Sequence, residues 1–119
     1  MEPVLIYIRD LIFSSKVVAS ARANGVEFKV VRDVSKLMET PAKRVMVDLN
    51  ADGALDAIVA WKQKHGGHVT GFCSHVAVAT LQRARDAGID RVMSNGAFSA
   101  NLDRILTGNS TASDSDLHD

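Results

Sequence analysis

Two aspartates stand where apolar runs end: Asp48 directly follows Val45–Val47, and Asp10 lies just past Val4–Ile8. Continuous apolar runs of this kind are typical of strands buried on both faces of a sheet. An acid at the carboxyl end of such a strand lies at the open edge where α/β proteins bind ligands or do chemistry. The pair therefore predicts a small pocket that handles phosphoryl groups or cations.

The elements that must position these acids alternate between strand and helix along the whole chain. Apolar runs predict strands at 4–8, 28–31, 44–49, 69–73 and 91–93, and helical periodicity with Gly and Pro stops predicts helices at 11–24, 34–39, 54–65, 75–87 and 99–106. Ser74 is the expected N-cap of the helix at 75–87, and Val76 of that helix is expected to face inward. Successive βα units form parallel sheets with right-handed crossovers. We therefore expect an α/β fold: a doubly wound five-stranded parallel sheet in the order 2-1-3-4-5, with helices on both faces and Asp10 near Asp48.

Length and composition limit the remaining possibilities. The chain has 119 residues, which predicts a single domain over 1–107, followed by a flexible Ser- and Asp-rich tail at 108–119. The formal net charge is zero, which argues against a nucleic-acid partner. No apolar run is long enough to span a bilayer, and the amino terminus lacks a signal-peptide pattern. The single cysteine fits a reducing compartment, so a cytoplasmic location is expected.

With these elements in place, the body of the chain, 4–106, resembles the receiver domain of bacterial two-component response regulators. The resemblance rests on the acid closing the first strand, the residues around Asp48, the polar end of the fourth strand and the alanine-glycine turn before the fifth: Arg9-Asp10, Val47-Asp48-Leu49-Asn50, Cys73-Ser74 and Ala87-Gly88-Ile89-Asp90. It implies a signalling module rather than an enzyme. It also implies a protein partner or a homodimer that uses the face of the fourth helix, fifth strand and fifth helix.

By the same resemblance, Asp48 takes the position of the phosphoacceptor. Asp10, Asp48 and the backbone carbonyl of Asn50 take the positions of Mg²⁺ ligands. The hydroxyl residue of the switch corresponds to Cys73 or Ser74. The spacing to the following glycine favours Cys73, and the chemistry favours Ser74.

Three pocket positions depart from the receiver pattern. Arg9 replaces the first of two adjacent acids, Asn95 replaces a lysine, and Val92 replaces the aromatic switch residue. Phosphoryl transfer needs positive charge around the transferred group, and receivers obtain it from magnesium and that lysine. The sequence therefore predicts an atypical receiver-like module with impaired phosphorylation. Arg9 either pairs with Asp48 or is a solvated surface charge.

Several residues admit a second interpretation. Asp10 could be only the N-cap of the following helix, and Asp48 only a loop acid that accepts backbone amides. Alternatively, the rim lined by Asp10, Phe13, Asp48 and Ser74 could bind a small ligand or nucleotide, with Phe13 as an apolar lip. Trp61 is off the apolar stripe of its helix and is either an exposed contact or the edge of the core. No set of acid, base and nucleophile can be assembled, so an enzyme is not expected.

Overall fold

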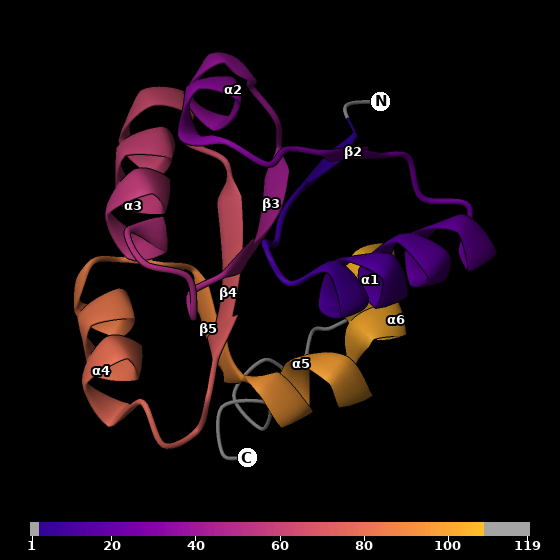
Figure 1. Ribbon diagram of the computed structural model, residues 1–119. Helices are drawn as coiled ribbons and strands as arrows, with labels where there is room; N and C mark the ends of the chain where they lie inside the picture. Colours follow the sequence, from indigo (N-terminus) through magenta and orange to yellow (C-terminus); the bar gives the residue numbers. More distant parts are fainter. Residues whose placement is uncertain (1–2, 109–119) are drawn as a thin grey trace.

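Five parallel strands form the centre of the molecule in the order β2-β1-β3-β4-β5 (Figure 1). The computed structural model describes residues 3–108, so the predicted tail lies outside the described residues except for Gly108. The strands are β1 (Val4–Tyr7), β2 (Phe28–Val30), β3 (Arg44–Asp48), β4 (His68–Cys73) and β5 (Arg91–Ser94). The predicted class, strand order and orientation are confirmed.

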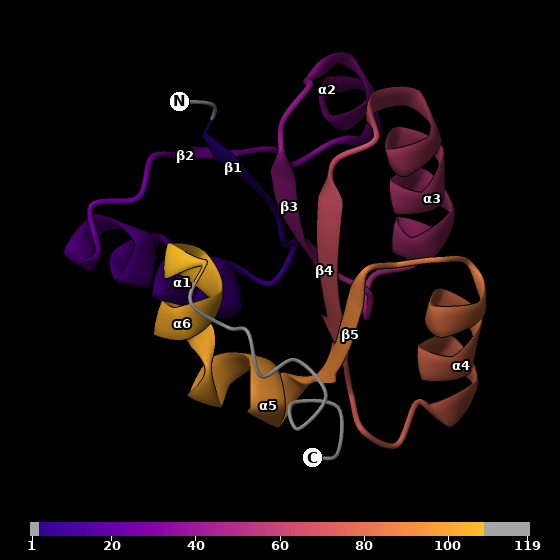
Figure 2. The same cartoon turned by 180° about the vertical axis from the view of Figure 1, so that it is seen from behind.

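Six helices of the described chain cover the two faces of this sheet. They are α1 (Leu11–Ala23), α2 (Val34–Glu39), α3 (Ala54–His65), α4 (Val78–Asp86), α5 (Asn95–Ala100) and α6 (Leu102–Thr107). Helices α2, α3 and α4 share one buried apolar cluster with the sheet, and α1, α5 and α6 share the other. Figures 1 and 2 show these two groups on opposite sides of the strands.

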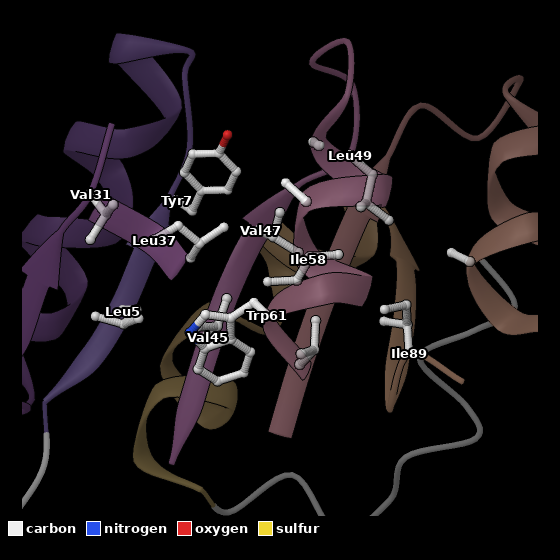
Figure 3. Packing of buried hydrophobic residues seen from close by; sticks show 14 of the residues in the cluster. Leu5, Tyr7, Val31, Leu37, Val45, Val47, Leu49, Ile58, Trp61 and Ile89 are labelled. Carbon is white, nitrogen blue, oxygen red and sulfur yellow. The ribbon is translucent and has the colours of Figure 1, made fainter. Parts of the chain in front are cut away.

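The core explains why the strands carry unbroken apolar runs. Leu5, Val45 and Val47 face the α2–α4 side, whereas Ile6 and Met46 face the α1–α5–α6 side, and all five are buried. Figure 3 shows the first of these clusters, with side chains from α2 and α3 lying over β1 and β3. A strand covered on both faces has no position for an exposed polar residue. The polar side chains of β3 therefore stand at its two ends, Arg44 and Asp48.

The helix after β4 begins later than its sequence predicts. Helix α4 starts at Val78, and its N-cap, Ala77, makes no side-chain capping bond. The amide of Ala77 donates instead to the Ser74 carbonyl in a turn, at 2.9 Å. The prediction that Ser74 caps a helix from residue 75 is therefore wrong. So is the prediction that Val76 faces inward, since it is 73% exposed.

The carboxyl-terminal helical region also differs from the predicted single helix at 99–106. The hydroxyl of Ser94 accepts from the amide of Ala97 at 3.0 Å and starts α5 at Asn95. Asn101 then ends α5 and precedes α6. In α1, Val17 and Ala21 are buried, whereas Ile12 is 85% exposed.

Candidate functional site: an amide-bridged aspartate at the carboxyl edge of the sheet

The carboxyl ends of four strands bring the predicted site residues to one edge of the sheet. In the strand register Tyr7 lies beside Val47, Asp48 beside Phe72, and Cys73 beside Ser94. The turns that follow β1, β3, β4 and β5 therefore meet at this edge. These turns and strand ends carry Asp10, Asp48, Ser74 and Asn95 respectively.

Asp48 is buried and its carboxylate is hydrogen-bonded within its own turn. The residue is 5% exposed. Its Oδ1 accepts from the backbone N–H of Asn50 at 2.9 Å and from Asn50 Nδ2 at 2.8 Å. A buried carboxylate is costly unless it is paired or hydrogen-bonded. These two bonds stabilise Asp48, and between residues 3 and 108 no cation forms an ion pair with it.

The side chain of Asn50 links three strand ends. Besides its bond to Asp48, its Nδ2 donates to Asn95 Oδ1 at 3.2 Å, and its Oδ1 accepts from the backbone N–H of Ser74 at 2.9 Å. We call this group of Asp48, Asn50, Ser74 and Asn95 the amide bridge. The sequence prediction gave Asn50 only a backbone carbonyl role, because nothing in the local pattern shows that its side chain reaches β4 and β5.

Asp10 and Arg9 lie at the same edge, and within the described residues neither side chain is bonded to this bridge. Asp10 is exposed, and its Oδ1 accepts from the N–H of Phe13 at 3.0 Å, which makes it the N-cap of α1. Arg9 is exposed and makes no ion pair with Asp48 in the described part of the chain. Of the two interpretations of Arg9, the structure therefore supports a solvated surface charge and not a counter-ion of Asp48.

The magnesium ligands that the resemblance implies are partly engaged in hydrogen bonds at this edge. Magnesium prefers octahedral oxygen coordination through one or two carboxylates and water. Here one oxygen of Asp10 is committed to its helix and one oxygen of Asp48 to Asn50. Within residues 3–108 no three His, Cys, Asp or Glu side chains gather as a metal-binding group. A magnesium role for Asp10, Asp48 and Asn50 stays a prediction.

The two candidates for the switch position lie in different surroundings. Cys73 is fully buried in the cluster under α3 and α4, and burial, followed by the negative charge of Asp48, raises the pKa of its thiol. Ser74 is half-buried and belongs to the amide bridge. Val92 is buried in the same cluster as Cys73. Ser74 joins the bridge only through its backbone N–H, so the switch position stays a prediction with Cys73 and Ser74 as its two candidates.

Two aromatic residues with open interpretations belong to the core. The ring of Phe13 stacks on Phe72 with centroids 4.7 Å apart and lies 5.7 Å from the ring of Phe98. Phe13 is therefore packed beneath the edge and is not an exposed lip, which weakens the small-ligand alternative. The side chain of Trp61, on α3, is fully buried in the cluster shared with α2 and the sheet (Figure 3).

No family model and no curated protein matches this sequence. Solved structures match it well, however. The receiver domain of TorR, a response regulator of the TMAO respiratory system, has a TM-score of 0.78 at 11% identity, with 96% of this chain and 100% of that chain covered. The receiver domain of NtrX from Brucella abortus has a TM-score of 0.74 at 16% identity, with 89% and 94% covered.

The fold is thus that of a receiver-like, flavodoxin-like domain. A de novo designed Rossmann 2x3 fold protein matches equally well, with a TM-score of 0.77 at 12% identity over 93% of this chain and 94% of that chain. Because a designed protein shares the architecture, the fold by itself does not carry a function. Across the described residues, no helix is long and apolar enough to cross a membrane.

Proposed function

We propose that this protein is a stand-alone, atypical receiver-like signalling module, with its working unit at 1–107, that acts by binding another protein and not as an enzyme. Phosphorylation of Asp48 is impaired in this proposal. The observation that carries it is the amide bridge: Asn95, in the place where the resemblance expects a lysine, joins Asn50 and brings no charge to Asp48.

The physical reason lies in the charge that phosphoryl transfer requires. The transferred group carries negative charge on its equatorial oxygens, and catalysis depends on cations that stabilise it. The bridge offers Asp48 only neutral amide donors, and the nearby Arg9 is solvated. One oxygen of the carboxylate is also occupied by Asn50. The pocket is therefore stable as it stands but is poorly suited to receive a phosphoryl group.

The test is incubation with acetyl phosphate and Mg²⁺, followed by intact-mass measurement. We expect no more than a trace of protein heavier by one phosphoryl group, under conditions where a receiver with the usual lysine is modified. An Asp48→Asn variant serves as the matched control, since it keeps the turn but removes the acceptor. A stable adduct that is lost in Asp48→Asn overturns the proposal of impaired phosphorylation.

We place the partner surface on α4, β5 and α5. Strand β5 is an edge strand of the sheet, and Val78 at the start of α4 is 68% exposed. An exposed large apolar side chain beside a strand edge favours contact with another protein. A second copy of this chain is the simplest occupant, which makes a homodimer.

Light scattering at increasing protein concentration tests this surface. We expect a concentration-dependent dimer, and we expect Val78→Lys to weaken it about tenfold or more, since it places a charge in the proposed contact. Val34→Lys is the matched control, because Val34 is also exposed, at 48%, but lies on α2. A strict monomer at high concentration, or equal effects of the two variants, would speak against this surface.

A further inference from the structure

Strand β2 forms one edge of the sheet, on the side of the molecule away from β5 (Figures 1 and 2). Within residues 3–108, β2 pairs with β1 and with no other strand. The amide of Val31 donates to the carbonyl of Ile6 at 3.0 Å, so the backbone of Val31 faces β1. Because alternate residues of a strand face opposite ways, the N–H and C=O groups of Phe28 and Val30 face outward. The outer edge of β2 can therefore pair with an added strand.

A cavity of about 430 Å³ lies along this edge and is lined by cations. Its lining residues are Lys29, Val30, Val31, Arg32 and Lys36, and none of them is an acid. The three cationic side chains are exposed and form no ion pair among residues 3–108. The cavity thus presents positive charge that has no counter-ion in the described part of the chain.

The charges next to the cavity leave the edge cationic. Arg22 of α1 lies with its guanidinium carbon 5.5 Å from the centre of the Phe28 ring, which brings a further cation to β2. The nearest acids in the sequence, Glu27 and Asp33, flank the strand and do not line the cavity. Asp33 is also engaged, because its Oδ1 accepts from the N–H of Lys36 at 2.8 Å as the N-cap of α2.

The charge of an edge strand restricts what can pair with it. Cationic side chains at an edge disfavour pairing with a second copy of the same strand, since like charges meet. The same side chains favour an acidic strand, and main-chain bonds to an edge are a common way to bind an extended peptide. We propose that the outer edge of β2 binds an extended acidic segment of a partner protein, which adds to the sheet as a further strand. This surface is distinct from the one on α4, β5 and α5, and it does not rest on the function proposed above.

The positions of the lysines indicate which residues of the segment are acidic. Lys29 lies on the same face of β2 as Val31, whose side chain is buried in the cluster that includes α2. Lys36 lies on α2 itself. Alternate side chains of an added strand point to this face. We therefore expect an acid at every second residue of the segment.

The probe is a capped synthetic peptide, Glu-Thr-Glu-Thr-Glu-Thr-Glu, in which threonine favours the extended conformation. We expect it to give saturable shifts in ¹H–¹⁵N NMR spectra at the amides of β2. At saturation the amides of Phe28 and Val30 should exchange with solvent about tenfold more slowly or less, because each gains a partner. The amide of Val31 is already bonded to Ile6, so its exchange rate should not change.

Matched variants and a matched peptide separate strand addition from general attraction between charges. Lys29→Gln/Lys36→Gln should weaken binding about fivefold, the effect of losing two exposed ion pairs. Lys43→Gln/Lys64→Gln removes the same charge from exposed positions outside β2 and α2, and its affinity should stay within about twofold of the parent chain. The same peptide with every backbone nitrogen methylated keeps its acids but has no N–H donor. It should bind about tenfold more weakly or worse, since the main-chain bonds are lost.

Equal binding of the two peptides, equal losses in the two double variants, or shifts spread over the surface overturn the proposal. Exchange measured without peptide tests two other occupants of the edge. Protection of Phe28 and Val30 that rises with protein concentration would mean a second copy. Protection that is lost in the triple variant Asp114→Asn, Asp116→Asn and Asp119→Asn would mean an acidic segment of this chain. Either result overturns a partner protein as the occupant, whereas fast exchange at both amides supports an open edge.

Discussion

Replacing Asn95 by lysine is expected to raise the rate at which acetyl phosphate modifies Asp48 by about a hundredfold. The substitution places a cation at a residue that the structure joins to Asp48 through a single side chain, Asn50. One preorganised donor aimed at developing charge is worth roughly 10²–10³ in rate. The substitution costs little stability, since it removes only one hydrogen bond of 3.2 Å, between the partly exposed amides of Asn50 and Asn95.

The measurement is the initial rate of adduct formation by intact mass, with Mg²⁺ present. Gln63→Lys is the matched control, because it adds the same charge at an exposed position of α3. Its rate should equal that of the parent chain. In the double variant Asp48→Asn/Asn95→Lys the gain should vanish, which assigns the adduct to Asp48.

If Asn95→Lys gives no gain, the missing lysine is not what limits phosphorylation. The next candidate is then Arg9, which stands where the resemblance expects an acid. Arg9→Asp alone and combined with Asn95→Lys would separate the two causes. A higher rate only in the double variant would mean that the lysine and the second acid act together, because interacting residues have non-additive effects.

The layered fold could be predicted from the sequence because its signals are local. The continuous apolar runs of β1 and β3 indicate strands covered on both faces, and α2 and α3 begin and end at their predicted residues. Asp33 caps α2 through the N–H of Lys36, and Gly66 ends α3 in the left-handed region at φ 73°. Each of these signals acts within a few residues of the boundary it sets.

The site could be predicted only in part, because its contacts join distant segments. The placement of Asp48 at the edge followed from one strand. The amide bridge did not, since Asn50 and Asn95 are brought together by the strand order. The same contact explains the error at α4. Ser74 has the residue type of an N-cap, but its N–H is held by Asn50 and its carbonyl closes a turn, so the helix starts three residues beyond the predicted start at 75.

Trp61→Ala is expected to lower the free energy of unfolding by about 3–5 kcal/mol, the usual cost of emptying a large aromatic site in a core. The indole is fully buried between α2, α3 and the sheet (Figure 3), and its Nε1–H donates to the carbonyl of Thr40 at 2.9 Å. Since domains are stable by roughly 5–15 kcal/mol, this loss removes a large part of the total. Urea unfolding followed by circular dichroism measures it.

Two further variants separate the packing of the ring from its hydrogen bond. Trp61→Phe keeps an aromatic ring but leaves the Thr40 carbonyl without its donor, which should cost about 1–3 kcal/mol. Gln63→Ala, an exposed change on the same helix, should stay within about 0.5 kcal/mol of the parent chain. A cost below about 1 kcal/mol for Trp61→Ala would contradict a core role for the ring.

Gly67 provides an independent check on the position of the same ring. A Cβ added there would lie 2.4 Å from Trp61 Cη2 and 2.5 Å from the carbonyl oxygen of Ala42. Gly67→Ala should therefore destabilise the protein. The cost should be smaller in a Trp61→Phe background, because the smaller ring removes the clash with the indole while the clash with the Ala42 carbonyl remains. Additive costs in this double-mutant cycle would mean that the ring does not press against Gly67. Non-additive costs would mean that the indole of α3 packs against the turn that enters β4. That packing positions the start of the strand whose far end leads into Ser74.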